Sequence, residues 1–91
     1  ARTLPNLPEH DEELDMLVTV YSKPNCPQCE YTKRDMDILG IRYQTIDLTN
    51  DKAQLQRLVQ AGYRSAPIVE TELGAWSGYN QEKIRSLVAS A

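Results

Sequence analysis

The sequence predicts a single α/β domain with a four-stranded mixed sheet flanked by three helices, in the order β-α-β-α-β-β-α. Two observations in the sequence support this class. Apolar runs of strand length alternate with helical patterns of ten or more residues through the first two thirds of the chain. Two short strand-like runs then follow each other with only a turn between them. The chain has 91 residues and 41% of them are hydrophobic, which suffices for one small core.

Charge is unevenly distributed along the chain. The formal net charge is −3, but residues 1–16 carry five acidic side chains and one basic side chain. We therefore expect residues 1–16 to form an acidic, flexible N-terminal arm, and residues 17–91 to form the folded domain. Residues 17–91 are nearly neutral and lack the basic stripe that is typical of nucleic-acid binding.

No segment has the roughly 20 apolar residues that are needed to cross a bilayer. The first 16 residues lack the apolar core of a secretory signal peptide. Two cysteines are far fewer than a secreted disulfide scaffold carries. We therefore expect a soluble cytoplasmic monomer that binds neither membranes nor nucleic acids.

The first strand and the first helix are expected on either side of a short loop. Leu17–Tyr21 is an apolar, β-branched run, typical of a strand that is buried on both faces. A helix is expected at Pro27–Leu39, because proline suits the first helical turn and Gly40 is a stop signal. Its predicted apolar face consists of Cys29, Thr32, Met36 and Leu39.

The second strand and the second helix follow directly. Ile41–Ile46 alternates apolar and polar residues, which is the period of a half-buried strand. A helix is expected near Asp51–Ala61, capped by Thr49 or Asn50. Its predicted buried positions are Leu55, Leu58 and Val59.

The last three elements are two strands and a helix. Pro67–Glu70 and Leu73–Trp76 are separated by too few residues for a crossover, so they should form an antiparallel hairpin. The first two strands flank a helix, so they should be parallel, with a right-handed crossover. Asn80 is a candidate cap for the last helix. The apolar positions of this helix are Ile84, Leu87 and Val88.

Cys26 and Cys29 are the only cysteines, and they lie at the junction between the first strand and the first helix. A C-x-x-C pair at such a junction is typical of a thioredoxin-like redox motif. If Cys26 caps the helix, unpaired backbone N–H groups and the helix dipole favour its thiolate. Such positions lower a cysteine pKa from about 8.5 to roughly 3.5–7.5. Lys23, three residues earlier, is a candidate for an additional positive charge.

The spacing of the two cysteines also predicts their roles. Cys29 lies one turn beyond Cys26 on the same helix face, so the two sulfurs can form a disulfide. We expect Cys26 to attack a disulfide of a partner protein and Cys29 to resolve the mixed disulfide. Pro27 and Gln28, between them, should tune the stability of the disulfide ring.

A metal site is the main alternative interpretation of the C-x-x-C pair. A closed zinc site needs four ligands, and His10 is the only histidine in the chain. An iron–sulfur cluster would need ligands from a second chain or from an external thiol. We therefore expect no metal, although a thiolate metal-binding module stays open as an alternative.

Three separated motifs resemble the NrdH-type redoxins, which belong to the glutaredoxin branch of the thioredoxin superfamily. They are Cys26-Pro27-Gln28-Cys29, Ser65-Ala66-Pro67 and Trp76-Ser77-Gly78-Tyr79, and Asp47-Leu48 lies between them. The resemblance covers roughly residues 17–90. It implies the thioredoxin/glutaredoxin fold and a thioredoxin-fold redox domain over residues 17–91.

The resemblance also implies roles and partners. Cys26 would be the nucleophile and Cys29 the resolving thiol. Pro67 would be a cis-proline beside them, with the Ala66 backbone free to pair with a substrate strand. No cofactor would be bound, since thioredoxin reductase would supply electrons from NADPH, and ribonucleotide reductase, usually of class Ib, would receive them. The surface that meets the partner would be shaped by Trp76, Ser77, Gly78 and Tyr79.

The sequence departs from this family at two places. Pro27 stands where family members often have an aliphatic residue, and it resembles the C-P-Y-C of glutaredoxins. A glutathione-dependent glutaredoxin is therefore the alternative function. Against it, Gln28 replaces the glutaredoxin tyrosine, and Asn80 stands near the position of an acid that holds the amino group of glutathione. We expect poor affinity for glutathione, because the buried ammonium would lack a charged partner.

Overall fold

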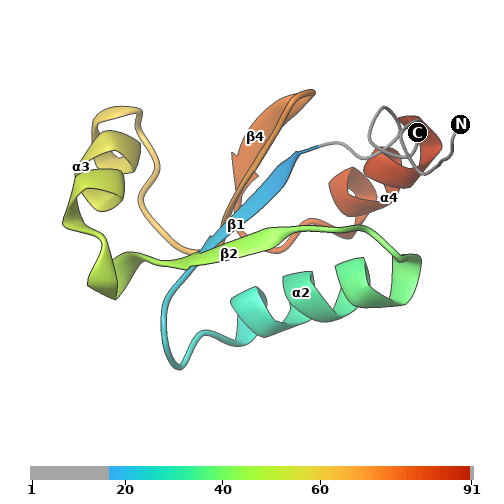
Figure 1. Ribbon diagram of the computed structural model, residues 1–91, viewed down its shortest axis with the longest axis horizontal. Helices are drawn as coiled ribbons and strands as arrows, with labels where there is room; N and C mark the ends of the chain where they lie inside the picture. The colour runs from blue at the N-terminus through green and yellow to red at the C-terminus, as the bar shows by residue number, and fades with distance from the viewer. Residues whose placement is uncertain (1–16, 91) are drawn as a thin grey trace, which may run out of the picture.

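The structure, a computed structural model, describes residues 17–90, with side chains described up to residue 88. The predicted acidic arm at residues 1–16 lies outside the described residues. The elements run in the predicted order (Figure 1). They are β1 (Val18–Ser22), α2 (Pro27–Leu39), β2 (Gln44–Asp47), the 3-10 turn η1 (Leu48–Asn50), α3 (Lys52–Gln60), β3 (Ile68–Thr71), β4 (Gly74–Ser77) and α4 (Gln81–Ser90).

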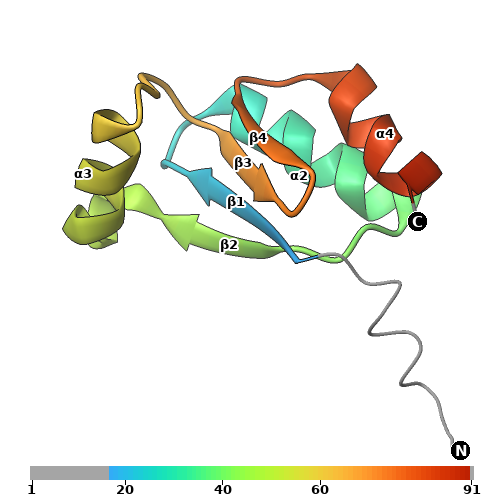
Figure 2. The same ribbon diagram turned by 90° about the horizontal axis from the view of Figure 1, so that it is seen from above.

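The four strands form one mixed sheet in the order β2-β1-β3-β4 (Figure 2). β1 pairs with β2 in parallel, as the helical connection between them predicts. β3 pairs antiparallel with both β1 and β4, so the predicted hairpin is confirmed. The central strand β1 therefore ends between two partners, and the loop that carries Cys26 leaves from that end of the sheet.

Helices cover both faces of the sheet. On one face, α2 and α4 pack against the inward side chains of β1 and β3 (Figure 2). On the other face, η1 and α3 pack against the alternate side chains of the same two strands (Figure 1). The first core cluster consists of Val18, Val20, Met36, Val69, Ile84 and Leu87. The second consists of Tyr21, Leu48, Leu58 and Ile68.

The start of α3 differs from the prediction. Asp51 caps the helix, because its Oδ1 accepts a hydrogen bond from the Gln54 amide at 3.2 Å. Thr49 and Asn50, the predicted caps, belong instead to η1, which Asp47 caps through the Thr49 amide at 2.9 Å. Because Thr49 and Asn50 belong to this additional 3-10 turn, the cap of α3 falls at the next residue, Asp51.

Four apolar side chains predicted to be buried are exposed. Leu17, predicted as the first residue of the buried strand, precedes β1 and is 63% exposed. Val59 is 58% exposed, because α3 turns only Leu58 fully and Leu55 partly toward the sheet. Leu39 is 39% exposed in the last turn of α2, where Ile41 makes the contact with the core. Val88 is 45% exposed, since Leu87 fills the corresponding position of α4.

Within residues 17–90, no helix is both long and apolar enough to span a membrane.

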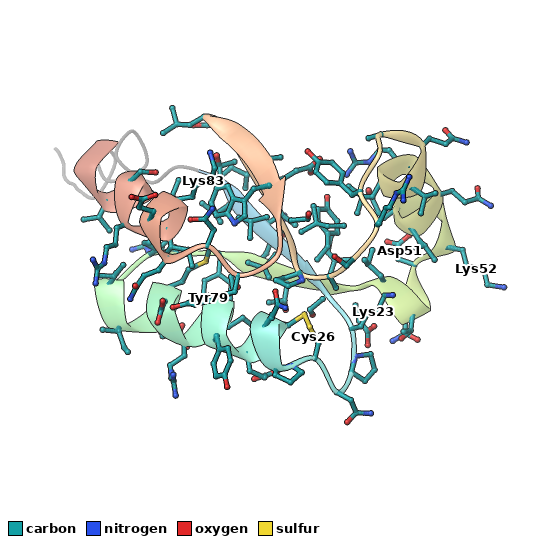
Figure 3. All side chains as sticks on the ribbon, turned by 180° about the vertical axis from the view of Figure 1, so that it is seen from behind. Lys23, Cys26, Asp51, Lys52, Tyr79 and Lys83 are labelled. Carbon is teal, nitrogen blue, oxygen red and sulfur yellow. A yellow bond between two sulfur atoms is a disulfide. The ribbon has the colours of Figure 1, made fainter. Side chains whose placement is uncertain are left out.

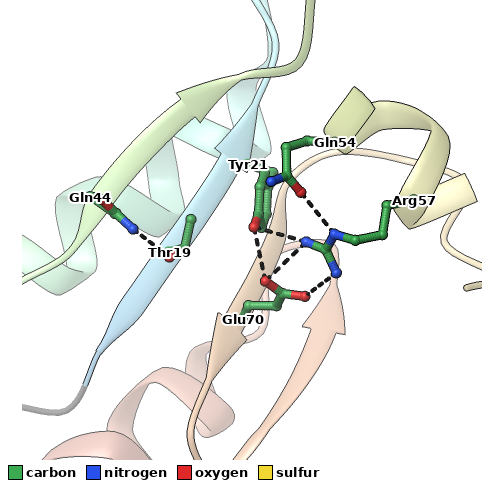
Figure 4. Close-up of polar contacts among 6 residues, drawn as sticks. All are labelled: Thr19, Tyr21, Gln44, Gln54, Arg57 and Glu70. Carbon is green, nitrogen blue, oxygen red and sulfur yellow. Dashed lines mark hydrogen bonds and ion pairs between the residues drawn. The ribbon is translucent and has the colours of Figure 1, made fainter. Parts of the chain in front are cut away.

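A polar cluster of three side chains attaches α3 to the sheet (Figure 4). The Arg57 guanidinium donates to Glu70 Oε2 at 2.9 Å and to the Tyr21 hydroxyl at 2.9 Å. The Tyr21 hydroxyl in turn donates to Glu70 Oε1 at 2.9 Å. The hydrogen bond from Arg57 lowers the pKa of the Glu70 carboxyl below its usual value of 4.5. The cluster therefore holds charged groups from α3 and β3 in one place over the end of β1.

Candidate active site

The two cysteines lie where β1 gives way to α2. Asn25 has a left-handed backbone (φ 57°) that turns the loop, and Cys26 follows in an extended conformation. Cys26 is the N-cap of α2, since its Sγ accepts a hydrogen bond from the Cys29 amide at 3.2 Å. The predicted cap is therefore confirmed. Gly40 ends the helix with φ 74°, as predicted.

Cys26 and Cys29 form a disulfide, with their Cα atoms 5.2 Å apart (Figure 3). Their environments differ. Cys29 is fully buried (0% exposed), whereas Cys26 is partly exposed at the start of the helix. Of the two cysteines, Cys26 is therefore the one that an external thiolate can approach. Backbone N–H groups at the helix start would stabilise negative charge on Cys26 after reduction.

The peptide bond between Ala66 and Pro67 is cis, as the resemblance implied. Pro67 is buried, and its carbonyl accepts a hydrogen bond from the Gly78 amide at 2.8 Å. It lies one position beyond the paired residues Tyr21 and Ile68, at the end of the sheet from which the cysteine loop leaves. The fold thus brings the cis-proline and the disulfide to the same end of the sheet.

The Trp76–Tyr79 segment is attached to both of these features. Tyr79 donates its amide to Gln28 Oε1 at 3.0 Å, and its hydroxyl donates to Asp35. The hydrogen bond to Asp35 raises the pKa of the Tyr79 hydroxyl above its usual value of 10.0. Ser77 is exposed, whereas Trp76, Gly78 and Tyr79 are half-buried. Trp76 and Tyr79 both pack against the first core cluster.

Lys23 and Pro27 are exposed beside the disulfide. Lys23 lies at the same end of the molecule as Cys26 (Figure 3). With Ala66 it lines a narrow groove between the loop before β3 and the apolar side chains of α3. Among residues 17–90, no group of three or more His, Cys, Asp or Glu side chains is placed to hold a metal ion.

Comparisons with known proteins agree with this geometry. The Glutaredoxin family model matches residues 18–72. The glutaredoxin-like protein NrdH of Salmonella typhimurium strain LT2 is 35% identical over 74 residues, which are 79% of this chain and 89% of the relative. NrdH of Lactococcus lactis subsp. cremoris is 30% identical over 71 residues, which are 78% of this chain and 99% of the relative.

A solved structure leads to the same family. The glutaredoxin-like protein NrdH-redoxin from Escherichia coli, described as having a thioredoxin-like activity profile, superposes with a TM-score of 0.78. It is 30% identical, and the match covers 79% of this chain and 95% of that one. The chain is an NrdH-type redoxin of the glutaredoxin family. The redoxin is accordingly a thiol-disulfide oxidoreductase with a redox-active Cys26–Cys29 pair.

The site of the redoxin contains contacts that the sequence analysis missed. The bond between Gln28 and Tyr79 joins residues that are 51 positions apart, and the bond between Tyr79 and Asp35 joins residues 44 positions apart. No local pattern signals either contact. The predicted cap Asn80 is confirmed, because its Oδ1 accepts a hydrogen bond from the Lys83 amide at 3.0 Å. That cap fixes the start of α4 directly after Tyr79.

Proposed function

We propose that the redoxin carries two electrons from thioredoxin reductase to a disulfide of a partner protein, with class Ib ribonucleotide reductase as the expected recipient. One observation carries this proposal. Cys26 caps a helix through its sulfur and is partly exposed, while Cys29 is buried one turn below it. This asymmetry suits a nucleophile and a resolving thiol.

The exchange would proceed in two steps. The Cys26 thiolate attacks one sulfur of the partner disulfide, and the other partner sulfur leaves as a thiolate that takes a proton from solvent. Cys29 then loses its proton and attacks the Cys26 sulfur of the mixed disulfide. The second partner thiolate leaves, and Cys26–Cys29 remains as a disulfide. Two electrons have passed to the partner.

Neighbouring residues would support both steps. We infer that the Ala66 backbone pairs with an extended partner segment, which its partial exposure directly before Pro67 permits. Exposed Lys23 would add positive charge near the Cys26 thiolate, and Pro27 would stiffen the first turn of α2. The partner would also meet the surface shaped by the Trp76–Tyr79 segment.

The redoxin would work as a monomer and without a bound cofactor of its own. NADPH would supply the electrons through thioredoxin reductase, which would reduce Cys26–Cys29 after each cycle. A C-x-x-C pair that must return to the dithiol form needs a reducing compartment, such as the cytoplasm.

Two coupled assays, run side by side, test the proposal. One contains NADPH, thioredoxin reductase and a protein disulfide, and the other contains NADPH, glutathione, glutathione reductase and the same disulfide. We expect turnover in the first assay and little turnover in the second. Turnover confined to the glutathione assay would make the protein a glutathione-dependent glutaredoxin instead.

A further inference from the structure

We propose that Gln28 is a positioning residue that fastens the redox helix to the turn before α4. In this way it would keep the Cys26 sulfur at a fixed position relative to the backbone at Ala66 and Pro67. The inference rests on the proposed function, because this relative position matters only when a partner segment binds beside the disulfide.

The first observation is the hydrogen bond itself. Gln28 lies between the two cysteines on the first turn of α2, and its Oε1 accepts the Tyr79 amide at 3.0 Å. Two other hydrogen bonds of this segment stay within α2 and its N-cap. The Cys29 amide donates to Cys26 Sγ, and the Thr32 hydroxyl donates to the Gln28 carbonyl. The Gln28 side chain therefore ties the disulfide-bearing turn to a different part of the fold.

The second observation is where that tie leads. Two successive amides of the turn point to different elements: Gly78 donates to the Pro67 carbonyl at 2.8 Å, and Tyr79 donates to Gln28. The path from the disulfide to the cis-proline thus contains two hydrogen bonds and one short turn. The Tyr79 hydroxyl adds a second attachment to α2, at Asp35. Asp35 lies seven residues beyond Gln28, which is about two helical turns.

The third observation is the fit at Gly78. Its backbone is left-handed (φ +83°), a conformation that favours glycine. A Cβ at this position would lie 3.4 Å from Gln28 Oε1, at the edge of ordinary van der Waals contact. Glycine thus lets the turn adopt this conformation and leaves room for the Gln28 carboxamide.

These contacts predict that the loss of Gln28 changes the rates of exchange with two kinds of substrate by different amounts. A small disulfide needs only the Cys26 thiolate. A protein disulfide also needs the Ala66 and Pro67 backbone at a fixed position relative to that sulfur. Removal of the Gln28 carboxamide should therefore slow exchange with a protein disulfide more than exchange with a small one.

The test uses the full chain with three substitutions. Gln28→Ala removes the acceptor. Gln28→Glu keeps an acceptor of the same length for the Tyr79 amide, and high salt in all assays screens its added charge. Gln56→Ala is the matched control, because Gln56 is an exposed helical glutamine on α3. Rate constants of the reduced proteins are measured with insulin disulfides and with dithiodipyridine.

We expect Gln28→Ala to lower the ratio of the insulin rate to the dithiodipyridine rate about fivefold, as loss of a hydrogen bond of ordinary strength would. The ratio should stay within about twofold of wild type for Gln28→Glu and Gln56→Ala. Equal slowing of both reactions by Gln28→Ala, or no change in either, would overturn the inference. A wild-type protein that reduces dithiodipyridine but not insulin would instead overturn the proposed function.

Amide hydrogen exchange gives a second readout that does not depend on turnover. The Tyr79 amide should exchange faster in Gln28→Ala and stay protected in Gln28→Glu, while core amides of β1 keep their protection in both variants. Unchanged protection of Tyr79 in Gln28→Ala would contradict the proposed attachment.

Discussion

At the scale of single residues, the two sulfurs differ through their positions on one helix. Cys26 is the cap, so its Sγ accepts the Cys29 amide of the first turn, and the residue remains partly exposed. Cys29 belongs to the buried face of α2, with Thr32 and Met36. Two identical side chains three residues apart thereby acquire different access to a partner.

The first prediction concerns these two sulfurs. Cys29→Ser should trap the partner as a stable mixed disulfide on Cys26, because no second thiol is present to resolve it. Cys26→Ser should form no adduct, since the remaining thiol is buried. Non-reducing electrophoresis and mass spectrometry of mixtures with the oxidised partner would detect the adduct. An adduct on Cys29 in the Cys26→Ser variant would contradict the assigned roles.

A second prediction concerns Tyr43, whose hydroxyl donates to Asp37 at 3.0 Å. Burial and this hydrogen bond raise the pKa of Tyr43 from 10.0 to about 12. Because the folded state holds the proton more tightly, the stabilisation is complete below the unfolded pKa of 10.0 and is lost as pH rises toward about 12. Tyr43→Phe removes this titrating group. The variant should therefore lose less stability than wild type as the pH rises above 10.0. Urea unfolding between neutral pH and alkaline pH would measure this difference.

At the scale of elements, α3 depends on a polar attachment as well as on apolar burial. Among its side chains only Leu58 is fully buried, and Leu55 is partly buried. Arg57, on the same helix, reaches Glu70 of β3 and Tyr21 of β1 (Figure 4). A nine-residue helix with so little buried apolar surface gains from a charge-assisted contact to the sheet.

A third prediction follows for Glu70. Glu70→Gln should destabilise the protein by about 1 kcal/mol near neutral pH, because a partly exposed ion pair is weakened. Glu72→Gln is the matched control, since Glu72 is exposed and lies two residues away in the hairpin turn.

The contribution of Glu70 to the stability of the fold should decrease in acid. Arg57 lowers the folded pKa of Glu70 below 4.5, so the stabilisation is present above about 4.5 and is lost as pH falls through the folded value. Wild type and Glu70→Gln should therefore converge in stability in acid. Urea unfolding of both proteins and of Glu72→Gln would test this, and an equal loss in the control would contradict the assignment.

At the scale of the whole molecule, one sheet separates two core clusters and places the site at one of its ends. The cysteine loop, the cis-proline and the turn before α4 all meet there, although they lie far apart in the sequence. Both clusters are built from residues 18–87. Every residue of these two core clusters therefore lies in the described part of the chain.

A fourth prediction concerns the boundary at residue 17. A chain of residues 17–91 should unfold in one cooperative transition, with a midpoint within about 3 °C of the full chain. It should also keep its rate with dithiodipyridine, because the disulfide and its helix cap lie inside this range. Calorimetry of both chains would measure the midpoint. A loss of cooperative unfolding in the shorter chain would assign residues 1–16 a structural role.

Local signals determined much of this protein from sequence alone. Pro27 and Gly40 set the limits of α2, and Asn80 set the start of α4, because caps and turns depend on neighbouring residues. The parallel pairing of β1 with β2 and the antiparallel hairpin of β3 and β4 followed from the length of each connection. Pro27 and the loop before it placed Cys26 at the helix start, and the family motifs indicated the cis-proline; the structure confirms both.

The tertiary structure alone decided which apolar helix positions are buried and which distant residues form hydrogen bonds. Leu39, Val59 and Val88 fit a buried helical face by spacing, yet they are exposed, because the orientation of each helix on the sheet decides which apolar positions contact the core. The bonds of Gln28 to Tyr79 and of Tyr21 to Glu70 join residues 51 and 49 positions apart. Periodicity and capping act over a few residues, whereas contacts at such separations exist only after the chain has closed around its core.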